Sequence, residues 1–149
     1  MGLPFIDLAA QQARIRQDVD QRIAAVLSHG AYILGPEVKE LEVALSERSG
    51  AAHVISCSSG TDALILALLG LGLRPGQGVI VPSFTFAASA EAMAVLGSVP
   101  VFAEIERSTY NLDPDGLPSA LAGAHAQNIE VVGIMCVGLF GQPADITRI

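Results

Sequence analysis

Apolar residues recur at helical spacing in the first part of the chain. The first stripe consists of Ile15, Val19, Ile23, Val26 and Leu27. It predicts a helix from about Gln12 to Ser28, which His29 and Gly30 would end. A second stripe follows Pro36, a residue that suits the first position of a helix, and runs to Gly50. The sequence therefore predicts two amphipathic helices before any strand.

The pattern then changes to short apolar runs that alternate with helices. The runs predict strands over 53–57, 79–81, 99–105 and 131–137. Helices are predicted over 62–71 and 86–96, after the capping residue Asp113, and from 141–145 onward. Such alternation implies right-handed crossovers and a mainly parallel sheet. Because the strands are apolar on both faces, helices should cover both sides. The expected fold class is α/β, with a mainly parallel sheet and flanking helices.

The sequence stops inside an apolar pattern. Ile146 and Ile149 begin a stripe about two turns into the last predicted helix, and nothing follows them. We therefore expect residues 1–149 to be the truncated N-terminal part of one larger domain. The pattern indicates no second domain and no internal repeat.

Composition and charge exclude several classes of protein. Eight basic and fifteen acidic residues give a net charge of -7, which leaves no electrostatic footprint for nucleic acid. The longest apolar run, 63–73, is too short to cross a membrane, and the first residues lack the pattern of a signal peptide. Cys57 and Cys136 have no disulfide or metal spacing, and the three histidines are scattered. We expect reduced cytoplasmic thiols, with Cys57 buried, and no metal site.

A polar turn, Ser58-Ser-Gly-Thr-Asp62, joins a predicted strand to a predicted helix. The N–H groups and the dipole at the start of a helix attract anions. Gly60 would let the backbone approach a phosphate, and Thr61 adds a hydroxyl donor. The segment is neither GxGxxG nor GxxxxGK[ST], so spacing alone favours an ordinary capped turn.

A second candidate segment, Pro82-Ser-Phe-Thr-Phe86, follows the next predicted strand. It should lie at the same carboxyl edge of the sheet, where open α/β sheets bind ligands. Phe84 or Phe86 could stack on a flat cofactor. We expect Phe84 to belong to the core instead.

Seven segments of the chain carry a family resemblance. They are Phe5-Ile-Asp-Leu8 with Gln11, Tyr32-Ile-Leu-Gly-Pro-Glu37, Ser59-Gly-Thr-Asp-Ala-Leu64, Val81-Pro-Ser-Phe-Thr-Phe86, Gly97 with Pro100-Val-Phe102, Thr109-Tyr-Asn-Leu-Asp-Pro114 and Gly141-Gln-Pro-Ala-Asp145. In this order they resemble the DegT/DnrJ/EryC1/StrS family of sugar aminotransferases. The opening half is most similar to enzymes that aminate the 3-position of an oxidised UDP-N-acetylglucosaminuronate in O-antigen biosynthesis.

The resemblance implies a fold-type-I large domain that uses pyridoxal 5'-phosphate (PLP). Members aminate a keto group on a nucleotide-linked sugar, usually with glutamate as donor, and build their active sites between two subunits. By motif, Gly60, Thr61 and Asp62 correspond to the phosphate-binding segment, and Phe86 to the aromatic residue that stacks on the PLP ring. The loop from Tyr32 to Gly35 resembles a segment near the sugar site.

The resemblance also implies that catalytic residues are missing. The family's Schiff-base lysine, and the Asp that pairs with the pyridine nitrogen, would come after position 149, so no catalytic residue is assigned. The only lysine, Lys39, lies among acidic residues and is expected on a solvated helix face with local ion pairs. The chain alone should therefore be inactive. At position 138 a glycine stands where the family has a histidine.

Two alternatives to the aminotransferase interpretation stay open. The chain could be a non-catalytic α/β module that binds a phosphorylated ligand or a partner. It could also be a fragment of a related PLP-dependent sugar 3-dehydratase, in which histidine replaces the lysine.

Overall fold

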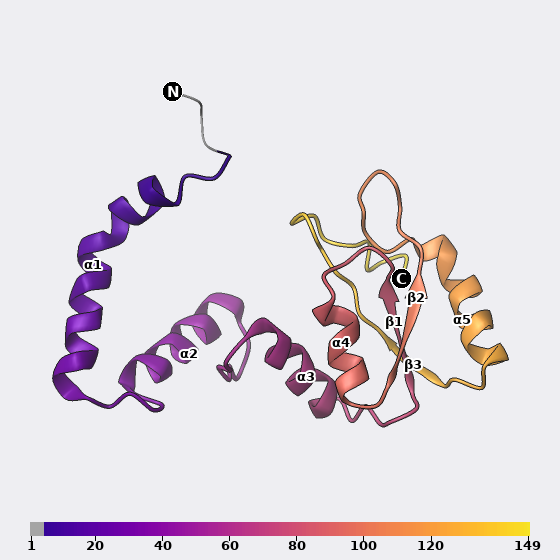
Figure 1. Cartoon of the computed structure of the whole chain (residues 1–149), viewed down its shortest axis with the longest axis horizontal. Coiled ribbons are helices and arrows are strands. Elements are labelled where there is room, and N and C mark those ends of the chain that lie inside the picture. Colours follow the sequence, from indigo (N-terminus) through magenta and orange to yellow (C-terminus); the bar gives the residue numbers. More distant parts are fainter. Residues whose placement is uncertain (1–4) are drawn as a thin grey trace. The chain divides into compact units, whose positions relative to one another are not determined.

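The structure, a computed structural model, describes residues 5–149 (Figure 1). The chain divides into two units, one that ends at Ser56 and one that spans Cys57–Ile149.

The first unit holds the two predicted helices. They are α1 (Leu8–His29) and α2 (Pro36–Ser49). The Asp7 carboxylate caps α1 by accepting a hydrogen bond from the Ala10 N–H at 2.9 Å, which explains why α1 begins before the expected Gln12. Both helices end at a glycine in the left-handed conformation, Gly30 and Gly50. Neither helix contains a buried residue.

The second unit contains a three-stranded parallel sheet. Its elements are α3 (Gly60–Gly70), β1 (Gly78–Pro82), α4 (Ala88–Val95), β2 (Val99–Ala103), the 3₁₀ turn η1 (Pro114–Gly116), α5 (Leu117–Ala126) and β3 (Val131–Ile134). The strand order is β2-β1-β3, so β1 is central, and both pairings are parallel. The predicted α/β fold class is confirmed.

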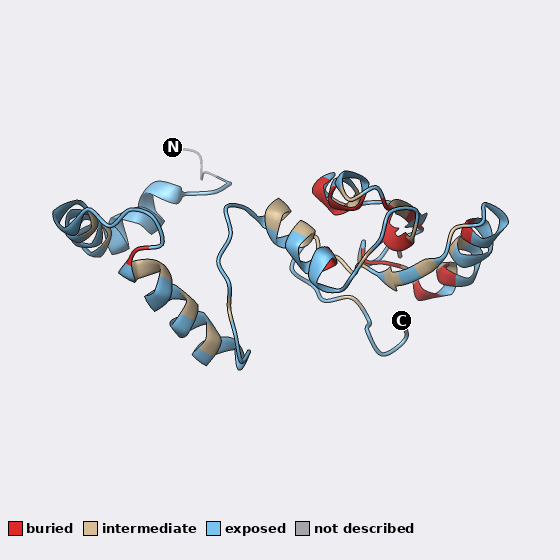
Figure 2. Ribbon diagram, turned by 90° about the horizontal axis from the view of Figure 1, so that it is seen from below, coloured by how far each residue is buried: buried red, intermediate tan, exposed pale blue. Residues whose placement is uncertain are grey.

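Side chains of β1 alternate between two apolar layers. Val79 and Val81 pack with Leu68 of α3 and with Met93 of α4. Ile80 points to the opposite layer, whose other buried members are Val101, Ala103, Leu112, Leu117 and Ala124. Every residue of β1 is buried (Figure 2). The sheet thus separates α3 and α4 from α5, and this arrangement fixes where the loops after each strand emerge.

Several boundaries differ from the predictions for physical reasons. Residues 53–57 form no strand, because a strand takes its hydrogen bonds from neighbours and none pairs with this segment among residues 5–149. β2 and β3 end earlier than expected, and Ile105 beyond β2 pairs antiparallel with Leu112. The segment 141–149 forms turns rather than a helix. Cys57, expected to be buried, is exposed.

Candidate functional site

The carboxyl edge of the parallel sheet gathers three loops. They begin after β1, β2 and β3 and cover 83–87, 104–113 and 135–149. The start of α3 faces the same edge, because the short segment 71–77 returns from the end of α3 to the start of β1. α3 and β1 are each about 16 Å long at the standard rise per residue, and Leu68 of α3 packs with Val79 of β1. The two elements therefore lie side by side in opposite directions, so the start of α3 is level with the end of β1. Ligands of open α/β sheets bind at this edge.

The turn at the start of α3 leaves two backbone donors free. The Ser59 hydroxyl accepts from the Asp62 N–H at 3.1 Å, and the Ser59 carbonyl accepts from the Ala63 N–H at 3.0 Å. In the part of the chain that the structure describes, the N–H groups of Gly60 and Thr61 have no protein acceptor. A Cβ built at Gly60 would meet no atom within 4 Å, so the backbone there is open to approach. The turn therefore has the donors that an anion requires.

Asp62 organises the serines of this turn. Its carboxylate accepts hydrogen bonds from the hydroxyls of Ser58 and of Ser59, the latter at 2.8 Å. The bond from Ser58, followed by that from Ser59, lowers the pKa of Asp62 below its usual value. The ionised side chain also interacts favourably with the dipole of α3. Since a carboxylate repels a phosphate, this geometry suits Asp62 to shaping the turn rather than to touching an anion.

Phe86 lies between β1 and α4, with 71% of its surface exposed. Its carbonyl accepts from the Ser89 N–H at 3.0 Å, which places it immediately before α4. The ring is therefore available for contact at the carboxyl edge. We expect the Phe86 ring to lie within about 10 Å of the Thr61 amide, which is the span of a cofactor ring and its phosphate.

An aromatic cluster of Phe84, Tyr110 and Phe140 joins the three loops. The ring centroids of Phe84 and Tyr110 lie 5.5 Å apart, those of Tyr110 and Phe140 5.5 Å, and those of Phe84 and Phe140 6.4 Å. Placing Phe84 in the core was wrong, because 46% of its surface is exposed. This cluster was not predicted from the sequence. The available signal was that each aromatic residue follows a strand of one parallel sheet.

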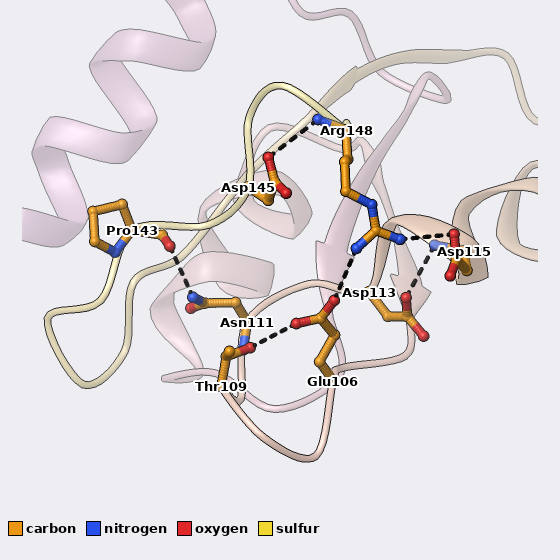
Figure 3. Close-up of polar contacts among 8 residues, drawn as sticks. All are labelled: Glu106, Thr109, Asn111, Asp113, Asp115, Pro143, Asp145 and Arg148. Carbon is orange, nitrogen blue, oxygen red and sulfur yellow. Dashed lines mark hydrogen bonds and ion pairs between the residues drawn. The ribbon is translucent and has the colours of Figure 1, made fainter.

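A polar network ties the segment after Phe140 to the loop after β2 (Figure 3). The buried Asn111 donates through Nδ2 to the carbonyls of Gln142 and Pro143, both at 3.1 Å. The Arg148 guanidinium contacts Asp115 at 2.9 Å and Glu106 at 3.3 Å. Its hydrogen bond to Asp115 is the main cause that raises the pKa of Arg148.

Lys39 lies exposed on α2, in the other unit. Of its acidic neighbours, Glu37 pairs with His29 at 2.9 Å and Glu40 with Arg22 at 3.8 Å. Over residues 5–149 no ion pair includes Lys39, so the local pairs expected for it are not formed. The solvated helix face predicted for this residue is confirmed.

Two features are absent from the part of the chain that the structure describes. Residues 5–149 contain no group of three or more His, Cys, Asp or Glu side chains arranged to hold a metal ion. No helix in the same range is long and apolar enough to cross a membrane.

A parallel α/β sheet with an open, donor-rich helix start and an exposed aromatic residue at its carboxyl edge is typical of proteins that bind phosphorylated ligands. The chain belongs to the DegT/DnrJ/EryC1/StrS aminotransferase family, which it matches over residues 13–149. Six of the seven sequence segments lie within this match, and the resemblance to the family is confirmed.

Individual relatives cover nearly the whole chain. It is 48% identical over 147 residues to the UDP-2-acetamido-2-deoxy-3-oxo-D-glucuronate aminotransferase of Pseudomonas aeruginosa, covering 99% of this chain and 39% of that protein. A DegT DnrJ EryC1 StrS aminotransferase from Brucella abortus has a similar solved structure, with a TM-score of 0.91 and 44% identity, covering 99% of this chain and 40% of that one. S. venezuelae DesV, solved with a ketimine intermediate, has a TM-score of 0.88 and 38% identity, covering 98% and 38%. The chain thus spans about two fifths of the length of these relatives.

Proposed function

We propose that this chain forms the cofactor-phosphate side of a PLP-dependent aminotransferase that acts on a nucleotide-linked keto sugar, with glutamate as the amino donor. The observation that carries the proposal is the start of α3, where the N–H groups of Gly60 and Thr61 are free at the carboxyl edge of the sheet. The family match and the activities for which the relatives are named support the reaction type.

The residues of the turn fit the phosphate group of PLP. The Gly60 and Thr61 N–H groups would donate to it, aided by the Thr61 hydroxyl and by the helix dipole. Asp62 would hold the Ser58 and Ser59 hydroxyls in place. Phe86, exposed at the same edge, would lie against the cofactor ring. When bound, PLP supplies the electron sink for amino-group transfer.

The substrate class follows from the most informative relative. The Pseudomonas aeruginosa protein is named for a UDP-linked 3-oxo-glucuronate, and 48% identity over 147 residues supports a UDP-linked 3-keto sugar for this chain as well. A second relative, from Acidithiobacillus ferrooxidans, is named for a UDP-linked 3-dehydro-glucosamine and is 38% identical. Both names share the nucleotide and the position of the keto group.

A homodimer in the cytoplasm completes the proposal. α1 and α2 expose Ile15, Ile23, Leu27, Leu41 and Leu45. Apolar side chains exposed in rows are typical of surfaces that a partner covers. A second copy of the chain would bury them, and light scattering of the purified chain would then give a mass of at least two copies.

The phosphate site is tested by two substitutions at one position. Gly60→Pro removes a single N–H donor, and proline suits the first residue of a helix when the preceding residue is extended, as Ser59 is at φ -159 and ψ 166. Gly60→Ala keeps the N–H group and is the matched control. In equilibrium dialysis with PLP, Gly60→Pro should bind about tenfold more weakly than Gly60→Ala, since a charge-assisted hydrogen bond contributes about 1.5 kcal/mol or more. Equal affinities of the two variants would contradict the phosphate site.

The absence of a catalytic lysine is tested by trapping. PLP mixed with the chain and treated with borohydride should not label Lys39 stoichiometrically, because that amine is exposed on α2. Stoichiometric labelling of Lys39 that Thr61→Ala abolishes would show that the chain carries a complete cofactor site.

A further inference from the structure

Two residues, Asn111 and Gly138, lie close to the carbonyl oxygen of Gln142. Asn111 donates to it from Nδ2 at 3.1 Å, and the same nitrogen also donates to the Pro143 carbonyl. A Cβ built at Gly138 would lie only 2.9 Å from the same oxygen. A real Cβ atom essentially never lies that close to a backbone oxygen, so the position of Gln142 depends on a glycine at 138.

In the sequence, Phe140 lies between Gly138 and Gln142. The turn that carries it is closed by a hydrogen bond from the Gly141 N–H to the Gly138 carbonyl at 3.0 Å. Its ring meets that of Tyr110 edge-on at 5.5 Å. The position of the ring therefore follows from where the turn is held.

Tyr110, the partner of Phe140, is held in place within the loop after β2, which also contains Asn111. Its φ of 61° is in the left-handed region, which is uncommon for tyrosine and concentrates at functional sites. Its N–H donates to the Glu106 carbonyl at 2.8 Å, and the following Asn111 N–H donates to the Thr109 hydroxyl at 3.2 Å. Asn111 thus contributes its backbone to the loop of Tyr110 and its side chain to the turn of Phe140.

We propose that Asn111 and Gly138 act together as positioning residues that hold Phe140 against Tyr110 and Phe84 at the carboxyl edge of the sheet. Asn111 binds the Gln142 carbonyl, and Gly138 leaves the space in which that carbonyl lies. This positioning role does not depend on which reaction the protein catalyses. The further statement that the aromatic cluster supports the ring side of the PLP site rests on the proposed function.

The chain offers a specific spectroscopic reporter. It has two tyrosines and no tryptophan, so in a Tyr32→Phe background Tyr110 is the only source of the near-UV tyrosine circular dichroism band. The test variants in this background are Asn111→Asp, which keeps the shape but loses the two donors, and Gly138→Ala. The matched controls are Gly133→Ala, where a Cβ meets nothing within 4 Å, and Gln127→Glu on an exposed amide.

Both test variants should lose most of the Tyr110 band while the far-UV spectrum is retained, and both controls should keep it. The double variant should lose no more than the larger single loss, because both changes act on one carbonyl. Retention of the band in Gly138→Ala, whose position is exposed and whose folding is least at risk, would overturn the proposal even if Asn111→Asp fails to fold.

A second measurement separates this proposal from the proposed function. PLP dissociation constants, measured by dialysis, should rise severalfold in Asn111→Asp and Gly138→Ala and stay unchanged in the controls. Unchanged constants in variants that have lost the Tyr110 band would overturn the link between the cluster and the cofactor. If the parent chain itself fails to bind PLP, the proposed function fails, while the Tyr110 band still decides the positioning.

Discussion

Strand β1 and helix α1 were both predicted from apolar residues in the sequence, but β1 is buried in the structure and α1 is not. All five residues of β1 are buried, and Ile80 has no exposed surface. None of the 22 residues of α1 is buried, and Ile23, at the centre of its stripe, keeps 52% of its surface exposed. The comparison teaches that periodicity identifies the face that an element would bury, whereas burial depends on the elements that surround it.

The difference in burial between β1 and α1 indicates which part of the chain contributes most to its stability. Apolar surface removed from water contributes about 25 cal/mol per Å², so the buried layers around β1 supply most of the driving force. α1 and α2 depend on caps and on intrinsic helix propensity, which are weak for helices without a packed face. The candidate site lies on the loops of the well-packed unit, where a rigid scaffold positions them.

The largest expected effect comes from substituting isoleucines in the two environments. Ile80→Ala should lower the free energy of unfolding by about 2–5 kcal/mol, because it leaves a cavity in the buried layer that Ile80 shares with Val101 and Leu112. Ile23→Ala, the same change on α1, should alter it by no more than about 0.5 kcal/mol. Urea denaturation followed by circular dichroism measures both. Equal losses would mean that α1 contributes to the same core as β1.

A smaller effect is expected from the two helix caps. Ser59 caps α3 and Asp7 caps α1, each with a side-chain oxygen that accepts from an N–H three residues on. Ser59→Ala should lower the free energy of unfolding of the sheet unit by about 1 kcal/mol. Asp7→Ala should reduce helicity in the far-UV spectrum without moving the main urea transition. A shift of that transition in Asp7→Ala would show that α1 unfolds together with the sheet.

The smallest effect concerns two carboxylates with lowered pKa values, one in each unit. The pKa of Asp62 is lowered first by the hydroxyl of Ser58, whereas that of Glu42 is lowered first by the backbone N–H of Ser56 and only second by its hydroxyl. Ser58→Ala should therefore raise the pKa of Asp62 by more than Ser56→Ala raises that of Glu42. Carboxyl ¹³C NMR titrations measure both values, and an equal rise would contradict the assigned causes.

The direction in which stability changes with pH follows from the lowered pKa values of Asp62 and Glu42. A carboxyl group with a folded pKa below its unfolded one stabilises the protein above the unfolded pKa. That stabilisation is lost as the pH falls through the folded value. Ser58→Ala should thus narrow the difference in stability between neutral and acidic pH. Because both groups are exposed, the change should be small.

Much of the sheet unit was predictable from sequence, because its strands are short apolar runs between strong turn signals. β1, the cap at Asp113 and the turn before α3 all lie where local residues place them. The segment 53–57 has the composition of a strand, but no strand pairs with it among residues 5–149, and strand pairing is a property of two segments rather than of one.

Only the parts of the candidate site that are formed by residues adjacent in the sequence could be predicted. Gly60, Thr61 and Asp62 adjoin in sequence, so their turn could be recognised, and the exposure of Phe86 agrees with its expected place. The organising bonds from Ser58 and Ser59 to Asp62 require side-chain geometry that no pattern encodes. The contact of Asn111 with Gln142 joins residues 31 positions apart, and a buried asparagine has no sequence signature.

Amide NMR of the ¹⁵N-labelled chain, titrated with PLP, is the decisive test of whether the start of α3 binds the cofactor phosphate. We expect saturable shifts centred on the Gly60 and Thr61 amides, with the amides of α1 and α2 unchanged, and a similar but weaker response to inorganic phosphate. Saturable shifts centred on Lys39, with Gly60 and Thr61 unaffected, would contradict this expectation.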